Sequence, residues 1–178
     1  MASCVYGCGS LTDYPERGCT ESLLVGGISY LFVKECGYEF DESSAGEWNT
    51  AITNGKVRVV GPVLGSKSEA SFTTRKIDSC NPERVGAAVR SVTFQDHNPN
   101  INVDAFYNDL LSQAQNFDFG YMDCNDRFYG WTSFSFQGSR VHDDSAQDGA
   151  SYVSGSVSYT GITDLEPIDM PVGVTGLT

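Results

Sequence analysis

Three cysteines stand within the first nineteen residues of this 178-residue chain, at Cys4, Cys8 and Cys19. Thiolates this close together can bind zinc, but a structural zinc site usually shows two close pairs with four thiolate or imidazole ligands. The second pair is missing here, and a three-cysteine site would need Cys36 to complete it. Six cysteines also allow a disulfide framework. We expect reduced, structural thiols and no bound metal or cofactor, which leaves the clustering unexplained.

Two further stretches resemble binding loops only in part. Residues 61–68, GPVLGSKS, lack the spacing of a phosphate loop, and a strand rather than a helix follows them. Residues 96–100, DHNPN, place oxygen atoms at alternate positions as a calcium loop does. The sixth position is Ile101 instead of glycine and the twelfth is Tyr107 instead of glutamate, so the bidentate ligand is absent. A turn leading into a helix is the prediction for this stretch.

The sequence gives no positive sign of catalysis. His142, Asp143 and Asp144 could supply an acid–base pair, but neighbouring side chains on a strand or loop point apart. No serine elbow, metalloprotease helix or dinucleotide fingerprint accompanies them. A solvated acidic loop is therefore predicted, and the protein is expected not to be an enzyme.

The charge of the chain is strongly negative, with 11 basic and 23 acidic residues and a formal net charge of −12. Such a surface repels phosphate backbones and anionic membranes, which argues against sequence-driven nucleic-acid binding. Solubility alone would also explain it. The apolar stretch 23–33 lacks a basic region before it and is too short to span a bilayer, so no signal peptide and no membrane association are expected.

The first half of the chain predicts short strands and one short helix. A strand is expected over 22–34 with a bulge at Gly26-Gly27, and another over 87–97. Between them, Ser44 can cap a short helix that ends before Gly55 and carries Trp48 on its apolar face. Strands over 56–65 and 68–77 are expected to be joined by a turn at Gly-Ser-Lys.

The strongest periodic signal predicts an amphipathic helix over 102–116, with Asn102 as its cap and Asp104 near the positive end of its dipole. Its apolar residues recur at helical spacing and form one stripe that needs a sheet to cover. These predicted core residues are Val103, Phe106, Tyr107, Leu110, Leu111 and Ala114.

Three aromatic or serine-rich strands are expected in the second half, over 117–124, 126–138 and 151–162, the first two meeting in a turn at residues 124–126. The predicted fold is α+β: a mainly antiparallel β-sandwich or barrel with one packed helix and a second short helix. The predicted organisation is an N-terminal arm (1–20), one β-rich domain (21–162) and an extended C-terminal arm (163–178) for assembly. The apolar residues of that arm include Leu165, Ile168, Met170, Val172 and Val174.

The order of these elements, with TTRKIDSCNPE (73–83) and YMDCNDRFYGW (121–131), resembles small virion proteins of tailed bacteriophages, in particular the neck and tail ring proteins of crAss-like phages. The resemblance spans about residues 19–160. It implies a homo-oligomeric ring, hexameric or dodecameric, on a tail-tube-like barrel or sandwich. Such a ring would contact adjacent neck, portal or tail proteins and let DNA pass without specific binding. The protein would be made in the host cytoplasm and reside in the virion.

The aromatic residues support an alternative function. Trp48, Trp131 and nineteen tyrosine and phenylalanine residues could include a platform on which sugars stack, as in a lectin-like module. Aromatics at alternate strand positions are more commonly core residues and cross-strand pairs. A glycan-binding β-sandwich is therefore the second hypothesis.

Overall fold

The structure, a computed structural model, describes residues 26–75, 84–100, 102–143 and 150–177. Within them lie ten β-strands, two α-helices and one short 3-10 helix, so the α+β prediction is confirmed. In chain order the elements are β1 (Ile28–Glu35), α1 (Ala45–Thr53), β2 (Val57–Val60), β3 (Leu64–Lys67), β4 (Ser71–Arg75), β5 (Arg84–Asp96), α2 (Val103–Gln113), η1 (Ala114–Asn116), β6 (Phe117–Asp123), β7 (Arg127–Ser133), β8 (Ser135–Asp143), β9 (Ala150–Gly161) and β10 (Pro167–Asp169).

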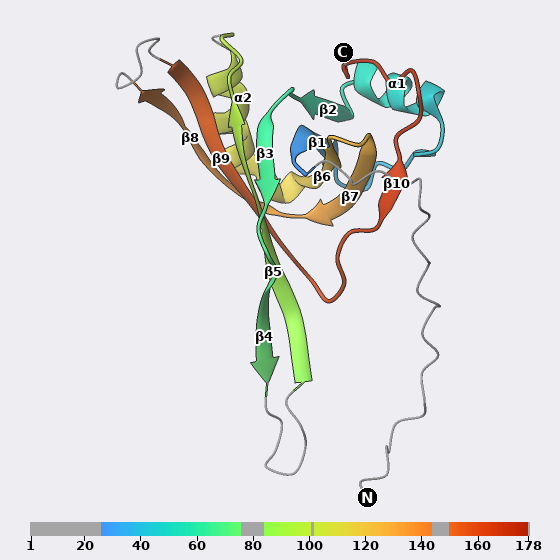
Figure 1. Ribbon diagram of the computed structural model, residues 1–178. Helices are drawn as coiled ribbons and strands as arrows, with labels where there is room; N and C mark the ends of the chain where they lie inside the picture. Colours follow the sequence, from blue (N-terminus) through green and yellow to red (C-terminus); the bar gives the residue numbers. More distant parts are fainter. Residues whose placement is uncertain (1–25, 76–83, 101, 144–149, 178) are drawn as a thin grey trace, which may run out of the picture.

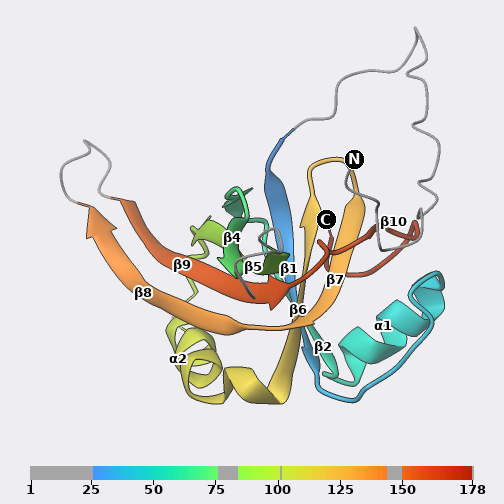
Figure 2. The ribbon, with the colours of Figure 1, turned by 90° about the horizontal axis from the view of Figure 1, so that it is seen from below.

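All ten strands belong to one antiparallel sheet, in the order β10-β7-β6-β1-β3-β5-β9-β8. Strand β2 pairs with β1 beside β3, and β4 pairs with β5 beside β3. The sheet does not close into a barrel, so the sandwich form of the prediction is the one that agrees with the structure. Figures 1 and 2 show α2 beside the half of the sheet made of β5, β8 and β9, and α1 beside the half made of β1, β2, β6 and β7.

Two hydrophobic clusters fill this arrangement. The first, here the α2 core, joins α2 to the inner faces of both halves of the sheet; its largest members are Phe94, Tyr107, Phe119, Tyr121, Phe136 and Tyr159. The second, the α1 core, joins α1 to the opposite face of β1, β6 and β7; its members are Phe32, Trp48, Ala51, Val57, Met122, Phe128 and Val174. The molecule therefore has three layers around the shared strands β1 and β6.

Strand β1 is buried on both faces because it separates the two cores. Leu31 and Val33 belong to the α2 core, and Phe32 between them belongs to the α1 core. Strand β6 repeats the pattern, with Tyr121 in the α2 core and Met122 in the α1 core. A strand covered on both faces has continuous apolar sequence rather than alternation, which explains the run YLFV in β1.

Helix α2 forms where predicted and buries most of its apolar stripe. Tyr107 and Leu110 are buried in the α2 core, and Val103 and Phe106 pack against it. The prediction was wrong for Leu111, which is 44% exposed. At about 100° per residue, Leu111 lies roughly 80° around the helix from Val103, at the edge of the stripe. The sheet therefore covers a narrower part of the helix surface than the apolar stripe occupies.

The two helix caps differ in how well the sequence predicts them. Ser44 caps α1 as expected, accepting a hydrogen bond from Glu47 N at 3.4 Å, and Gly55 follows the helix with a φ of +70°. Asn102 occupies the cap position of α2, but its side chain makes no capping hydrogen bond. Instead its backbone N–H donates to Asn100 Oδ1 at 2.9 Å. The predicted capping role of Asn102 is therefore wrong, because the preceding asparagine organises the chain there.

The turn predicted at Gly-Ser-Lys is also wrong. Residues 64–67 are strand β3, which pairs with β5 from Leu64↔Gln95 to Lys67↔Val92. The chain only bends earlier, at Gly61-Pro62, where Gly61 has a φ of +147°, and β2 and β3 follow one another in the same direction along β1. Gly65 serves close packing, since a Cβ atom there would lie 2.9 Å from Ile28 Cβ. In this case the glycine marks a close approach of two strands rather than a turn.

The second half of the chain follows the predicted strands with one division. Strands β6 and β7 meet in the expected turn, with Asp126 at a φ of +58°. The predicted strand 126–138 is two strands: β7 pairs with β6, whereas β8 pairs with β9 in the other half of the sheet. The chain changes partner at Phe134, whose ring packs on Phe119 in the α2 core.

Candidate functional site

The thiols that the structure describes stand apart from one another. Cys4, Cys8, Cys19 and Cys80 lie outside the described residues, while Cys36 and Cys124 are exposed free thiols. Desolvation and the nearby negative charge of Asp118 raise the pKa of the Cys36 thiol. A raised pKa lowers the thiolate fraction, so Cys36 is a poor nucleophile at neutral pH. Among the described residues, no group of three histidine, cysteine or acidic side chains could hold a metal ion.

The DHNPN stretch forms a ladder of side-chain-to-backbone hydrogen bonds. Asp96 Oδ1 accepts from Asn98 N at 2.9 Å, and Asn98 Oδ1 accepts from Asn100 N at 3.0 Å. The other oxygen of buried Asp96 accepts from the Tyr107 hydroxyl at 2.9 Å. These hydrogen bonds hold the loop against α2. The stretch therefore forms the predicted turn leading into a helix.

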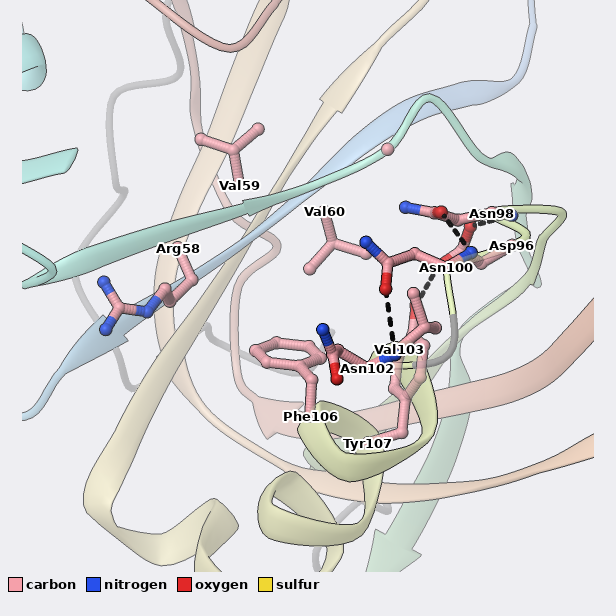
Figure 3. A pocket seen from close by; sticks show the side chains of 11 residues that line it. Arg58, Val59, Val60, Asp96, Asn98, Asn100, Asn102, Val103, Phe106 and Tyr107 are labelled. Atoms are coloured by element: carbon pink, nitrogen blue, oxygen red, sulfur yellow. Dashed lines mark hydrogen bonds between the residues drawn. The ribbon is translucent and has the colours of Figure 1, made fainter. Parts of the chain in front are cut away.

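A hollow of about 250 Å³ lies between β2 and this loop. Figure 3 shows Val60 and Phe106 on its apolar side and three carboxamide side chains, those of Asn98, Asn100 and Asn102, on its polar side. Arg58 lies at one end and extends away from the carboxamides. The hollow thus lies where this loop is held against the start of α2.

The predicted acid–base stretch lies at the end of β8. His142 is exposed and pairs in the sheet with Ser151. Asp143 pairs with Ala150, and Asp144 lies outside the described residues. The other histidine, His97, packs its ring on Tyr152 at a centroid distance of 5.0 Å. No contact among the described residues therefore supports a catalytic role for either histidine.

The aromatic residues divide between core and surface. Trp48 is fully buried in the α1 core, with edge contacts to Phe32 and Phe128 and a hydrogen bond from its Nε1 to Glu42 O at 2.9 Å. Trp48 is therefore a core residue and cannot serve as a sugar platform. Tyr121 and Tyr129 form a different pair on neighbouring strands, stacked at 4.8 Å with 9° between their planes.

A polar network lies beside that tyrosine pair. Asp164 forms an ion pair with Lys67, accepts from the Tyr159 hydroxyl at 3.2 Å and lies 3.5 Å from Nε of buried Arg90. Burial raises the pKa of the Asp164 carboxyl, but hydrogen bonds from Lys67 and from the backbone N–H of Leu165 lower it more, so the pKa lies below its ordinary value. Burial and the charge of Asp164 raise the pKa of Tyr159 to about 12. At neutral pH the network holds an ionised carboxylate and neutral tyrosines.

The C-terminal arm lies on the chain's own domain. Strand β10 pairs with β7, Val174 is buried in the α1 core, and Met170 packs against that core. Asn49 of α1 fixes the arm further, donating to Gly173 O at 3.0 Å and accepting from Thr175 N at 2.7 Å. The predicted extended arm is thus bound by β7 and α1 of its own chain.

The apolar arm residues differ in exposure. Leu165 packs against the α2 core, and Met170 and Val174 belong with the α1 core. Ile168 is 37% exposed and Val172 is 98% exposed. Among these apolar residues, Ile168 and Val172 are the ones exposed for contact with a neighbouring subunit, and that role of the arm stays a prediction.

Sequence reasoning missed the most prominent surface feature, a two-stranded ribbon formed by β4 and the first part of β5. Figure 1 shows it projecting from the rest of the described chain. Strand β9 pairs with β5 only over residues 88–96, so nothing flanks the ribbon beyond that point in the described structure. Phe72 is 56% exposed and Val89 is 44% exposed. Each strand of the ribbon contributes one of these exposed side chains, and sequence periodicity cannot tell which face of a strand lacks a cover.

Comparison with known proteins finds no match to this chain among family models, curated proteins or solved structures. In the described residues, neither helix has the length and apolar character needed to cross a membrane. The function is therefore argued from the ribbon, the charge distribution and the hollows of this structure.

Proposed function

We propose that this chain is a non-enzymatic structural protein of a tailed-bacteriophage virion, which assembles into a homo-oligomeric ring in the neck or tail. The projecting β4–β5 ribbon is the observation that carries the proposal. An isolated two-stranded ribbon is marginally stable in water at best, so a ribbon of this kind needs a partner surface. A second copy of the chain supplies such a surface repeatedly in a closed ring.

The exposed apolar residues of the ribbon support insertion between neighbours. Phe72 pairs with Ala88, and Val89 pairs with Ser71, at the base of the ribbon where β9 still pairs with β5. Directly opposed residues of an antiparallel pair project to the same face, while successive residues alternate. Phe72 and Val89 therefore lie on opposite faces of the ribbon, so each face carries one exposed apolar side chain. An exposed apolar side chain on each face fits a cleft between neighbours better than a flat surface.

Charge complementarity favours a second copy as the partner. The two strands of the ribbon, residues 71–75 and 84–89, contain two basic residues and no acidic residue, whereas the rest of the sequence contains nine basic and twenty-three acidic residues. A net positive ribbon is attracted to the net negative body of its neighbour. In the assembled ring the remaining acidic surface repels DNA phosphates, so DNA passes the channel without specific binding. Adjacent portal, neck or tail proteins would contact the two flat sides of the ring.

The test is assembly of the full chain, measured by light scattering after size exclusion and by negative-stain electron microscopy. We expect closed rings from the native chain. The double variant Phe72→Ser and Val89→Ser should remain folded by circular dichroism and be mostly monomeric. Leu64→Ser is the matched control, since Leu64 is an equally apolar residue, 69% exposed, on β3 outside the ribbon.

Two outcomes would contradict the proposal. A native chain that remains monomeric up to its solubility limit rules out self-assembly into a ring. Rings formed equally well by the double variant would show that the ribbon is not the contact.

A further inference from the structure

A second hollow, of about 500 Å³, lies beside the stacked tyrosines where the start of β1, strand β3, the β6–β7 turn and the loop before β10 meet. Its volume falls within the range of about 300–1,000 Å³ typical of small-ligand sites. Its polar and aromatic side chains are those of Ser66, Lys67, Tyr121, Asp123, Asn125, Tyr129 and Asp164.

One wall of the hollow is a fixed aromatic surface. Tyr121 and Tyr129 face each other in the register of β6 and β7, and their rings stack at 4.8 Å. Tyr121 is 3% exposed, whereas Tyr129 is half-buried and forms the outer ring of the pair. The Tyr129 hydroxyl donates to Asp123 Oδ2 at 3.3 Å, and Asp123 Oδ1 accepts from the backbone of residues 125 and 127. Tyr129 is thus held in place before any ligand arrives.

The rim of the hollow combines hydrogen-bond donors and acceptors. Lys67 lies with its Nζ 5.7 Å from the centroid of the Tyr121 ring and pairs with Asp164. The Asp164 side chain remains 47% exposed, so its carboxylate can accept further hydrogen bonds. The Ser66 hydroxyl, which already shares a hydrogen bond of 3.1 Å with Thr93 Oγ1, keeps capacity for one further hydrogen bond.

The charges of the hollow select against ionic ligands. An anion would meet the carboxylates of Asp123 and Asp164, and a cation would meet the ammonium group of Lys67. Both carboxylates are already engaged in hydrogen bonds or an ion pair, which disfavours a metal ion. A neutral molecule with several hydroxyl groups and one apolar C–H face satisfies both the rim and the aromatic wall. Sugars have this combination of features.

We propose that this hollow binds a neutral sugar residue of a glycan, with the C–H face of the sugar on Tyr129 and its hydroxyl groups on Lys67 and Asp164. The inference is independent of ring assembly, since all the residues that form the hollow belong to one chain. Sugar binding by a chain that stays monomeric would support this inference and contradict ring assembly. Ring assembly without sugar binding would do the reverse.

The experiment uses the full chain and a panel of free neutral sugars: glucose, galactose, mannose, fucose and N-acetylglucosamine. Sialic acid serves as an anionic comparator. Saturation-transfer NMR identifies binding, and titration gives the dissociation constant. We expect at least one neutral sugar to bind, with sialic acid at least tenfold weaker.

Three variants locate the site. Tyr129→Ala should weaken binding at least tenfold, while Tyr129→Phe, which keeps the ring, should bind within about threefold of the native chain. Tyr152→Ala is the matched control, because Tyr152 is a half-buried strand tyrosine that packs on His97 and does not line the hollow. If Tyr129→Ala is unfolded by circular dichroism, Asp164→Asn replaces it, with the same expected loss.

The proposal is overturned if none of the five neutral sugars binds at millimolar concentration. It is overturned equally if sialic acid binds more tightly than all of them, or if folded Tyr129→Ala binds as the native chain does.

Discussion

The two hydrophobic cores share strands β1 and β6 but are built from different chemistry. The α1 core is a cluster of aromatic rings in mostly edge-to-face contact, with Trp48 touching Phe32, Phe40 and Phe128. The α2 core also contains aromatic rings, but its tyrosine hydroxyls are tied to carboxylates, Tyr107 to Asp96 and Tyr159 to Asp164. The α1 core thus depends on ring packing and on the hydrogen bond from Trp48 Nε1 to Glu42 O, whereas the α2 core depends on packing together with a defined protonation state.

The largest expected effect is in the α1 core. Trp48→Ala removes a fully buried ring, and such truncations cost about 3–5 kcal/mol of unfolding free energy through lost burial and cavity formation. Urea unfolding followed by circular dichroism measures the loss. Tyr38→Ala, at the partly buried edge of the same core, should cost clearly less. Equal losses in the two variants would mean that Trp48 is not the centre of the cluster.

The corresponding variant in the α2 core is Leu110→Ala, with Leu111→Ala as its neighbour control. Leu110 is 6% exposed and its truncation should cost about 2–5 kcal/mol. Leu111 is 44% exposed, so its truncation should cost under about 1 kcal/mol. The same urea titration distinguishes the two positions. A larger loss at Leu111 than at Leu110 would reverse the orientation of α2.

A smaller effect should appear where the C-terminal arm closes the α1 core. Val174→Ala removes buried aliphatic carbon and should cost about 1.5–2.5 kcal/mol, at roughly 0.8 kcal/mol per buried methylene plus a cavity contribution. Val172→Ala, in the same arm and 98% exposed, should change stability by less than about 0.5 kcal/mol. Thermal unfolding of both variants tests the difference. If Val174→Ala is as stable as Val172→Ala, the arm does not lie on the α1 core in solution.

A further effect is confined to alkaline pH and to the α2 core. The pKa of Tyr159 is raised from its ordinary value near 10 to about 12, so folding favours the protonated hydroxyl. This contribution is fully present below about pH 10 and is lost as the pH rises through about 12. We expect the urea midpoint to fall over that range, and to fall less in Tyr159→Phe, which has no proton to lose. If Tyr159→Phe showed the same pH dependence as the native chain, ionisation of Tyr159 would not be the cause of the fall in the urea midpoint.

The acidic side of the same network gives the opposite sign. The pKa of Asp164 is lowered in the folded chain, so its contribution is present above the ordinary carboxyl pKa and is lost as the pH falls through the folded value. Asp164→Asn should therefore weaken the loss of stability during acid titration, measured by the urea midpoint. Because the Asp164 side chain is 47% exposed, solvent screening keeps this effect small.

Local sequence signals predicted most of the elements but not their contacts. The spacing of Val103, Tyr107 and Leu110 identified α2, and Ser44 identified the start of α1. The glycine at position 65 was misread, because a glycine that permits close packing has the same sequence appearance as one in a turn. The candidate sugar site could not be predicted, since Lys67, Tyr129 and Asp164 are far apart in the sequence and meet only when the sheet forms.

The sequence by itself determined the α+β class, the net negative charge and the apolar stripe of α2, because composition and periodicity depend only on neighbouring residues. The tertiary structure alone decided that β1 and β6 are buried on both faces, that residues 163–177 lie on the chain's own domain, and that β4 and the start of β5 project as a ribbon. The sequence pattern of apolar residues does not indicate which surface will cover them. That choice follows from strand pairing between residues distant in sequence, which brings Asn49 to Thr175 and leaves Phe72 in solvent.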